Sequence, residues 1–264
     1  MSGPDAIAPN NLDRHFGLGG QVALVIGATS GLGAAVAGGL ADAGAEVVVA
    51  GRDGARGEEV VRSIVARGGA ATSEPVDVAQ PDSIAALRTR VMDRLGRVDV
   101  LVNSAGIFLR AKAEEVTPAD WDATFRVNVT GTFLACQLFG RDMLERGYGR
   151  IVNFASTDGM VGVPDQVAYC ASKGAVVQLT RTLGAEWVAR GVNVNAVGPC
   201  DFATPMIADA LDEPDYRDWI LEAIPAGRVG QPEEIVGAVL FLASPAASMV
   251  AGHTLMVDGG RIAI

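Results

Sequence analysis

Two residue types that often carry chemistry are scarce in this chain, and their scarcity excludes several classes of site. The 264 residues include only two histidines, His15 and His253, and three cysteines, Cys136, Cys170 and Cys200. A histidine-based metal centre and a Ser-His-Asp triad are therefore poorly supplied, and we expect no metal site. The cysteines are odd in number and widely spaced, without a CxxC pattern, which is typical of reduced thiols in a cytoplasmic protein.

Basic runs are also missing, and the formal net charge is −10. This balance argues against nucleic acid or an anionic membrane as a partner. Residues 1–16 lack the basic and apolar regions of a secretory signal, so we expect a flexible polar tail there. Residues 21–41 carry no charge over a length that could span a membrane, but repeated glycines and an initial strand pattern argue against a membrane helix.

Short apolar runs alternate with longer segments of helical spacing, several of which begin near a proline, a common helix start. Nearly continuous apolar strands separated by helices predict a parallel sheet covered on both faces. We therefore expect one α/β domain over 17–264, a Rossmann fold with a doubly wound, seven-stranded parallel sheet. The expected strands are 22–27, 45–50, 71–78, 98–103, 150–156, 192–199 and 253–258, and the clearest helical segments are 81–95 and 118–146.

Residues 202–229 fit this alternation least well, because they form a long excursion between the sixth and seventh expected strands. Its helical pieces are broken by Pro205, Pro214 and Pro225. A long insertion in a compact domain usually serves as a lid or substrate loop. A purely structural helical hairpin is the alternative.

Gly27, Gly31 and Gly33 follow the first expected strand with GxxxGxG spacing and precede a helix. Glycines at such a turn let the backbone approach a pyrophosphate, whose charge then meets the free N–H groups of the helix start. The combination predicts a dinucleotide site in the first βαβ unit.

The end of the second expected strand bears on which nucleotide binds. An acid there hydrogen-bonds a ribose 2′-hydroxyl, whereas an arginine accommodates a 2′-phosphate. Gly51 occupies the usual place of the acid and Arg52 follows it, while we expect Asp53 to cap the helix that starts near Gly54. This pattern favours NADP(H), with NAD(H) as the alternative because Asp53 also lies at the distance typical of an NAD-type acid.

Four polar residues form the candidate catalytic set. Tyr169 and Lys173, in "AYCASKGA", lie four residues apart and share one helix face. A nearby lysine cation lowers the pKa of a tyrosine from about 10, which would make Tyr169 a general acid/base. Ser156 ends the fifth expected strand at the edge where ligands bind such sheets. Asn128 lies in an apolar helical segment, where an unpaired amide would be costly.

In their order and spacing, "GATSGLG", "PVDV", "NSAG", "RVNVTG", "IVNFAS", "YCASK", "NVNAVGPC" and "HTLMVDGG" resemble the short-chain dehydrogenase/reductase family over 16–264. The resemblance implies an oxidoreductase in which Tyr169 exchanges a proton with the substrate oxygen and Ser156 hydrogen-bonds that oxygen. It also implies that Lys173 binds the nicotinamide ribose and lowers the Tyr169 pKa, and that Asn128 organises a proton relay. The implied cofactor contacts are Gly27, Thr29, Ser30, Gly31, Leu32, Gly33, Arg52, Asp77, Val78, Asn103, Ala105, Gly106, Tyr169, Lys173, Pro199, Phe202 and Thr204.

Three positions depart from the family pattern. Ile26 replaces a threonine before the first glycine, and Ser104 replaces an asparagine. Cys200 replaces a glycine after the sixth strand, close to the expected nicotinamide position. A side chain there could alter cofactor placement, add a redox-sensitive thiol, or simply be tolerated.

Within the family, the chain is most similar to gluconate 5-dehydrogenase and deoxygluconate dehydrogenase-type members, which implies a sugar-acid substrate. Arg110 suits carboxylate recognition, although a surface pair with Glu114 or Glu115 is an equal alternative. Further candidates for the pocket wall are Asp158, Gln166 and Trp219.

Two other functions compete with this interpretation. A 3-oxoacyl or small-ketone reductase would use an apolar pocket built from Met160, Val161, Val163 and Met206. A nucleotide-binding regulator that lost its chemistry is disfavoured by the intact set of four polar residues. Helical segments 118–146 and 167–190 are apolar on more than one face, which favours a homotetramer or homodimer over a monomer that buries them internally.

Overall fold

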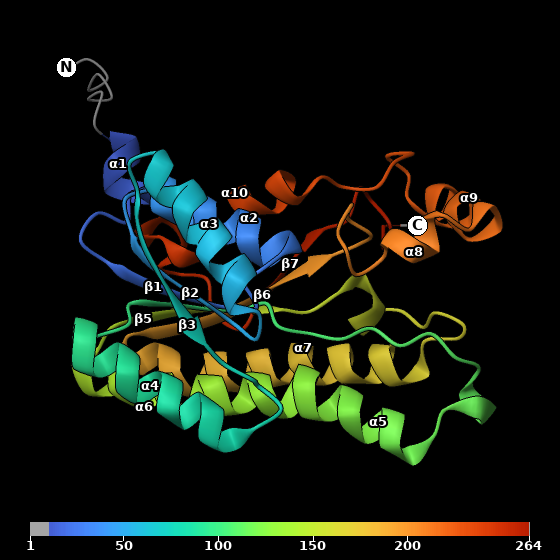
Figure 1. Cartoon of the computed structure of the whole chain (residues 1–264), viewed down its shortest axis with the longest axis horizontal. Coiled ribbons are helices and arrows are strands. Elements are labelled where there is room, and N and C mark those ends of the chain that lie inside the picture. The colour runs from blue at the N-terminus through green and yellow to red at the C-terminus, as the bar shows by residue number, and fades with distance from the viewer. Residues whose placement is uncertain (1–10, 264) are drawn as a thin grey trace, which may run out of the picture.

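The computed structural model describes residues 11–263, without the side chains of residues 11, 209 and 210. Within that range seven parallel strands form one sheet in the order β3-β2-β1-β4-β5-β6-β7 (Figure 1). This confirms the predicted doubly wound α/β sheet, since a strand occurs at each of the seven expected runs. The strands are β1 (Val22–Ile26), β2 (Glu46–Gly51), β3 (Ala70–Pro75), β4 (Val100–Asn103), β5 (Gly149–Phe154), β6 (Val192–Pro199) and β7 (Thr254–Val257).

Helices cover both faces of the sheet (Figure 1). One layer contains α2 (Gly31–Asp42), α3 (Gly54–Ala66) and α10 (Val236–Ala243), and the other contains α4 (Pro81–Leu95), α5 (Pro118–Phe125), α6 (Thr132–Arg146) and α7 (Val167–Trp187). Among the helices of residues 11–263, none is long and apolar enough to cross a bilayer.

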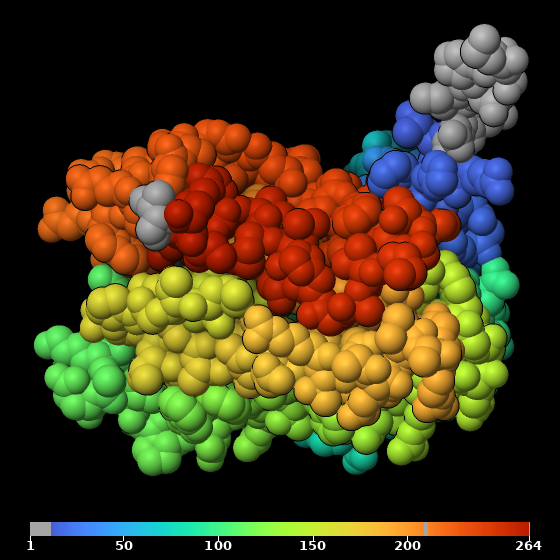
Figure 2. All heavy atoms as spheres, turned by 180° about the vertical axis from the view of Figure 1, so that it is seen from behind, coloured from blue at the N-terminus to red at the C-terminus, as the bar shows by residue number. Residues whose placement is uncertain are grey.

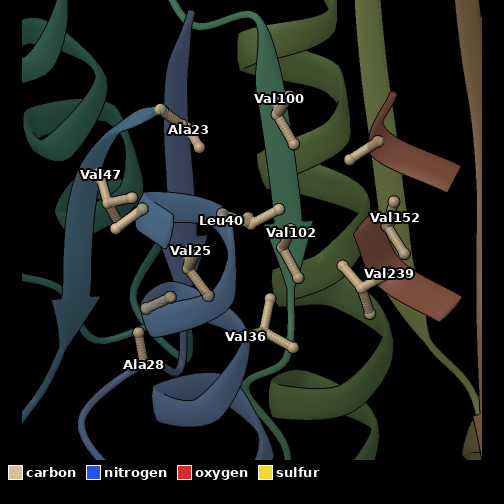
Figure 3. Close-up of a cluster of buried hydrophobic side chains, with 14 of the residues drawn as sticks. Ala23, Val25, Ala28, Val36, Leu40, Val47, Val100, Val102, Val152 and Val239 are labelled. Carbon is tan, nitrogen blue, oxygen red and sulfur yellow. The ribbon is translucent and has the colours of Figure 1, made fainter. Parts of the chain in front are cut away.

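The alternation of side chains along each strand divides the core into two clusters. Ala23 and Val25 of β1 face the α2 and α10 layer, whereas Leu24 and Ile26 face the layer of α4, α6 and α7. Figure 3 shows the first cluster, in which Val25 and its neighbours on adjacent strands lie close to side chains of α2 and α10. Burying each valine or leucine contributes roughly 1.5–3 kcal/mol, so these two layers hold the sheet rigidly below the site.

The last part of the expected N-terminal tail is helical. Residues 1–10 lie outside the described range, and Asn11–Phe16 form the helix α1. The helix ends where Gly17 donates its N–H to the carbonyl of Asp13. Leu18 is then fully buried and donates its N–H to Ala43 at 2.8 Å, which anchors this segment to the domain.

The segment 118–146 is helical throughout, but it is not one regular α-helix. Between α5 and α6 the residues Arg126–Gly131 form a wider π-helical turn that carries Asn128. Helical spacing of the side chains continues through this turn, so the sequence pattern does not reveal it. Such turns often occur at functional sites because they redirect one side chain.

The excursion after β6 contains two helices, α8 (Ala208–Leu211) and α9 (Pro214–Ala223). Its two ends are joined by a short parallel bridge, in which Ala203 donates its N–H to Gly230 and Gly230 donates to Asp201, both at 2.9 Å. Figure 2 shows this segment, in orange, packed against the red C-terminal residues above α7. The excursion is therefore tied to the sheet at its base and lies beyond the carboxyl ends of the strands (Figure 1).

Candidate active site

A cleft of about 810 Å³ opens at the carboxyl ends of β1 and β4, the two strands between which the chain order reverses. Open α/β sheets bind their ligands at this switch point. Of the predicted cofactor contacts, fifteen line the cleft, and Asn103 and Phe202 do not. The fifteen are Gly27, Thr29, Ser30, Gly31, Leu32, Gly33, Arg52, Asp77, Val78, Ala105, Gly106, Tyr169, Lys173, Pro199 and Thr204.

The glycine turn brings two backbone segments into direct contact. A Cβ on Gly27 would lie 2.4 Å from the nitrogen of Ala105, and one on Gly33 would lie 2.1 Å from the carbonyl oxygen of Gly27. Helix α2 starts beside this turn, its N-cap Ser30 makes no side-chain cap hydrogen bond, and its first turn contains no acid. The first N–H groups of the helix are thus left to bind an anion, so these residues fit the pyrophosphate of a dinucleotide.

Asn103 and Phe202 do not line the cleft. The Asn103 side chain is buried and donates to Asn153 Oδ1 at 2.9 Å, within the sheet rather than toward the cleft. Phe202 lines a smaller neighbouring hollow. The contacts expected from these two segments are made by their backbone, so the directions of the two side chains do not bear on them.

The end of β2 has the predicted register. Asp53 caps α3 by accepting a hydrogen bond from the Arg56 N–H at 3.1 Å, and its carboxylate also pairs with the Arg56 side chain at 3.4 Å. Arg52 is exposed at the cleft wall. A Cβ on Gly51 would lie 2.5 Å from Cγ2 of Thr29, so an acid there would require the Thr29 side chain to move. Arg56 is a further cationic lining residue that the sequence analysis missed, although its place one turn beyond Arg52 could have indicated it.

Lys173 and Asn128 face the same small space beside Gly106. A Cβ on Gly106 would lie 3.4 Å from Asn128 Oδ1 and 3.6 Å from Lys173 Nζ. The Lys173 ammonium donates to the Phe154 carbonyl at 2.8 Å. Asn128 accepts from the Ile107 N–H at 2.8 Å and donates to its carbonyl at 3.0 Å. The buried amide is therefore paired, as its position in an apolar helix requires.

Tyr169 and Ser156 meet at a second hollow of about 80 Å³ that adjoins the cleft. The Tyr169 ring lies on the boundary, since it lines both spaces, and it packs edge-on against Phe108 with centroids 5.1 Å apart. Ser156 accepts from the Asp158 N–H at 3.1 Å, which fixes its hydroxyl at the start of a short turn. Tyr169, Ser156 and Lys173 thus line adjoining spaces, and Asn128 lies next to Lys173 beside Gly106.

The electrostatics of Tyr169 differ from the expectation. Burial, reinforced by the negative charge of Asp158, raises its pKa above the ordinary value, and the hydrogen bond with Ser156 opposes this only in part. Burial also lowers the pKa of Lys173 to about 8. The prediction that Lys173 lowers the Tyr169 pKa is therefore wrong for the protein alone, because its ammonium lies 5.6 Å from the ring centroid and burial dominates. Tyr169 holds its proton at neutral pH.

The predicted substrate residues divide into two pairs. Asp158 and Gln166 line the hollow. Arg110 lies outside it, with its guanidinium 3.2 Å from Glu213 and stacked over the Tyr216 ring at 4.2 Å, so it does not pair with the acids at 114 and 115. Trp219 also lies outside the hollow and stacks on the Tyr216 ring, with the two ring centroids 5.5 Å apart.

Three ionisable lining residues were missed by the sequence analysis: Asp201, Tyr216 and Arg261. Arg261 reaches the hollow from the turn after β7, where Asp258 accepts the N–H groups of Gly260 and Ile262 at 3.0 Å. The only sequence signal was a single charge in the apolar end "RIAI". Its position depends on the packing of the C-terminal turn.

The four residues expected to build an apolar pocket for a 3-oxoacyl substrate do not come together. Met160 and Val161 are exposed, and neither they nor Val163 line the cleft or the hollow. Met206 alone of the four lines both spaces. The lining of the hollow is mixed, with apolar side chains such as Phe108 and Phe202 beside polar ones such as Ser156 and Asp158. In residues 11–263, no three His, Cys, Asp or Glu side chains gather as metal ligands would.

A dinucleotide cleft at the switch point, next to the half-buried Tyr169 and the buried Lys173, defines a nicotinamide-dependent oxidoreductase of the α/β class. A family model described as enoyl-(acyl carrier protein) reductase matches residues 27–261, and the chain belongs to the short-chain dehydrogenase/reductase family. The chain is 43% identical over 250 residues to D-threitol dehydrogenase of Mycolicibacterium smegmatis, covering 95% of this chain and 96% of the relative.

Two further relatives cover the same span. Gluconate 5-dehydrogenase of Gluconobacter oxydans is 40% identical over 245 residues, covering 93% of this chain and 96% of the relative. The crystal structure of a gluconate 5-dehydrogenase from Burkholderia cenocepacia J2315, in complex with NADP and tartrate, superposes with a TM-score of 0.92 at 38% identity. That match covers 96% of this chain and 99% of the neighbour.

Proposed function

We propose that this oxidoreductase interconverts a secondary alcohol and a ketone on a small polyhydroxylated substrate, a sugar acid or a sugar alcohol, with Tyr169 as general acid/base. The observation that carries the proposal is the position of Tyr169, whose ring lines both the dinucleotide cleft and the adjoining hollow. A substrate in the hollow would therefore lie next to the cofactor and within reach of the phenol.

Each of the four candidate catalytic residues has a distinct role in this proposal. When bound, the nicotinamide would accept or donate the hydride. Ser156 would hydrogen-bond the substrate oxygen, and Tyr169 would give that oxygen its proton during reduction or take it during oxidation. Lys173, fixed by the Phe154 carbonyl, would bind ribose hydroxyls. Asn128 would position the water through which the proton exchanges with solvent.

NADP(H) is the preferred cofactor in this proposal. Arg52 is exposed on the cleft wall, whereas the carboxylate of Asp53 is engaged by the N–H and side chain of Arg56. An acid that caps a helix is poorly available to a ribose hydroxyl, and two arginines nearby favour a 2′-phosphate. NADP in the complex of the Burkholderia relative supports the same preference.

The small size of the hollow and its ionisable side chains support a small hydroxylated substrate over a long acyl chain. It measures about 80 Å³, and Asp158, Asp201 and Arg261 lie among its lining residues. The relatives named for D-threitol and gluconate support the same class.

Turnover on a substrate panel tests this function. Purified protein is given sugar alcohols and sugar acids, including D-threitol and D-gluconate, with NADP and NAD in parallel, and nicotinamide reduction is followed by absorbance. We expect oxidation of at least one polyhydroxylated substrate, faster with NADP. Reduction of 3-oxoacyl esters, with no reaction on any polyhydroxylated substrate in either direction, would contradict the proposal.

We also propose that the chain forms a homotetramer or homodimer in the cytoplasm. Large apolar side chains are exposed on the layer of α5, α6 and α7, among them Trp121, Phe133 and Val167. A second copy would cover such a face.

Cys136, Cys170 and Cys200 are all free thiols, which suits a reducing compartment.

For residues 202–229, the lining contributed by Thr204, Met206 and Ile207 supports a role as a substrate lid.

A further inference from the structure

Three charged side chains from neighbouring strand ends line the hollow beside Tyr169. Asp158 follows β5, Asp201 follows β6 and Arg261 follows β7. The Arg261 guanidinium lies 2.6 Å from Asp201 Oδ2 and 3.8 Å from Asp158 Oδ1. All three side chains are almost enclosed, with exposed fractions of 7% for Arg261, 11% for Asp158 and 17% for Asp201. The hollow therefore holds two carboxylates and one cation.

Arg261, the cation of the hollow, is already paired with a carboxylate. Arg261 donates to Asp201, and its guanidinium stacks over the Trp219 ring at 5.3 Å. It is also the only arginine or lysine among the described residues that line the hollow. The two nearest other cations point elsewhere, since Arg110 is held by Glu213 and Lys173 by the Phe154 carbonyl. A carboxylate entering the hollow would therefore meet two carboxylates against one cation that is already paired with Asp201.

Two hydrogen-bond acceptors of the hollow, in contrast, lack a donor. Asp158 Oδ1 accepts from the Thr157 hydroxyl at 3.1 Å, and no described donor reaches Asp158 Oδ2. The Gln166 side chain is 3% exposed, and its Oε1 is buried with no hydrogen-bond partner among the described residues. Its amide nitrogen donates to the Tyr216 hydroxyl at 3.4 Å, which turns the oxygen away from that ring. A buried acceptor without a donor is costly, so a ligand that donates hydrogen bonds would be favoured.

Hydroxyl groups supply such donors, and carboxylates do not. We propose that the hollow selects a neutral polyol over the corresponding sugar acid, with Asp158 and Gln166 as the specificity-determining residues that accept hydrogen bonds from its hydroxyls. This inference rests on the proposed function, of which it narrows the substrate class. Burial raises the pKa values of Asp158 and Asp201, which shows that negative charge is already disfavoured in this space before a substrate arrives.

Matched substrate pairs test the inference on the unaltered protein. Each alditol of four to six carbons is paired with its aldonic acid, for example D-threitol with D-threonate and D-glucitol with D-gluconate, so that only a CH₂OH and a COO⁻ differ. We measure kcat/KM for each, and we measure binding by titration calorimetry in the presence of reduced cofactor, where no turnover occurs. We expect the polyol to exceed its acid at least tenfold in both quantities.

The possible outcomes distinguish a failure of this inference from a failure of the proposed function. An acid that binds and reacts as well as its polyol, or better, overturns the inference and leaves the proposed function intact. A protein that turns over neither class while reducing other ketones contradicts the proposed function itself.

Two variants test whether Asp158 and Gln166 produce the selectivity for the polyol over the acid. Asp158→Asn keeps the size of the side chain and removes its charge, so we expect the polyol-to-acid ratio of kcat/KM to fall at least tenfold, mainly through KM. Gln166→Met removes the open acceptor, and we expect weaker polyol binding with little effect on the acid. Asp165→Asn is the matched control, because Asp165 is exposed, lies outside the hollow and has φ of 61°, which asparagine tolerates. An unchanged ratio in both Asp158→Asn and Gln166→Met would overturn the assignment, and the wild-type comparison decides the inference whether or not a variant folds.

Discussion

The ammonium nitrogen of Lys173 lies 2.8 Å from the carbonyl oxygen of Phe154. This bond joins α7 to the carboxyl end of β5 and holds a buried cation one helical turn from Tyr169. A backbone dipole, not a carboxylate, is its partner, so the charge has no paired counter-ion. Burial consequently lowers the pKa of Lys173 from 10.5 to about 8.

This depressed pKa predicts a pH-dependent stability. Between about pH 8 and its ordinary value of 10.5, Lys173 is protonated in the unfolded chain and largely neutral in the folded protein. The unfolded state then binds more protons, so the free energy of unfolding rises with pH in this window. Relative to Lys173→Met, the wild type should gain about 2 kcal/mol from pH 8 to about pH 9.5, at about 1.36 kcal/mol per pH unit.

Urea unfolding of both proteins at the two pH values measures this gain. Comparison with the variant cancels the titration of all other groups, which are the same in both chains. If the two proteins differed by the same free energy of unfolding at both pH values, the Lys173 ammonium would not be desolvated in the folded state.

The Asn128 side chain predicts a structural cost in addition to its proposed role in proton transfer. Asn128→Ala would leave the N–H and the carbonyl of Ile107 without their partners. Because each unpaired, partly buried polar group costs about 1–3 kcal/mol, we expect the free energy of unfolding to fall by about 2–4 kcal/mol. Ser172→Ala removes the bond that its hydroxyl accepts from Asn128 Nδ2 and the one that it donates to the Tyr169 carbonyl, but it leaves both Ile107 groups paired, so its loss should be only about 1 kcal/mol. Equal losses in chemical denaturation would contradict the bridging role of Asn128.

The patterns that the sequence revealed are local ones. Short apolar runs located all seven strands, and the proline that begins the helical pattern of 81–95 gave the bounds of α4. The glycine turn and the Asp53 cap were also correct, because both depend on residues within a few positions of each other. Short-range rules of backbone conformation suffice for such features.

What the sequence did not reveal depends on contacts between distant segments. Arg261 meets Asp201 across 60 positions, and Arg110 meets Glu213 across 103. The sign of the Tyr169 pKa shift follows from burial, which no spacing of two residues shows. The charges that line the hollow, on which the proposed substrate class rests, thus became visible only in the folded chain.

The exposed guanidinium of Arg52 predicts a nucleotide-specific effect. Arg52→Ala should raise the KM for NADP about 10- to 100-fold, which corresponds to one charge-assisted hydrogen bond of about 1.5–3 kcal/mol, and should leave the KM for NAD nearly unchanged. Arg62→Ala serves as the control, since Arg62 is exposed on α3 and does not line the cleft. Steady-state kinetics with both nucleotides provides the comparison. A parallel loss with NADP and NAD would place Arg52 outside 2′-phosphate recognition.

The most direct test of the account is the turnover number of Tyr169→Phe with the substrate that the wild type oxidises best. The substitution keeps the ring and its contact with Phe108 but removes the hydroxyl that exchanges the proton. Tyr148→Phe, whose hydroxyl is 3.4 Å from Gln21 and remote from the cleft, is the matched control. We predict that kcat falls by about 10²- to 10⁴-fold in Tyr169→Phe, with cofactor binding retained, and stays at the wild-type value in Tyr148→Phe. A Tyr169→Phe enzyme that turns over at the wild-type rate would contradict the assignment of Tyr169 as the general acid/base.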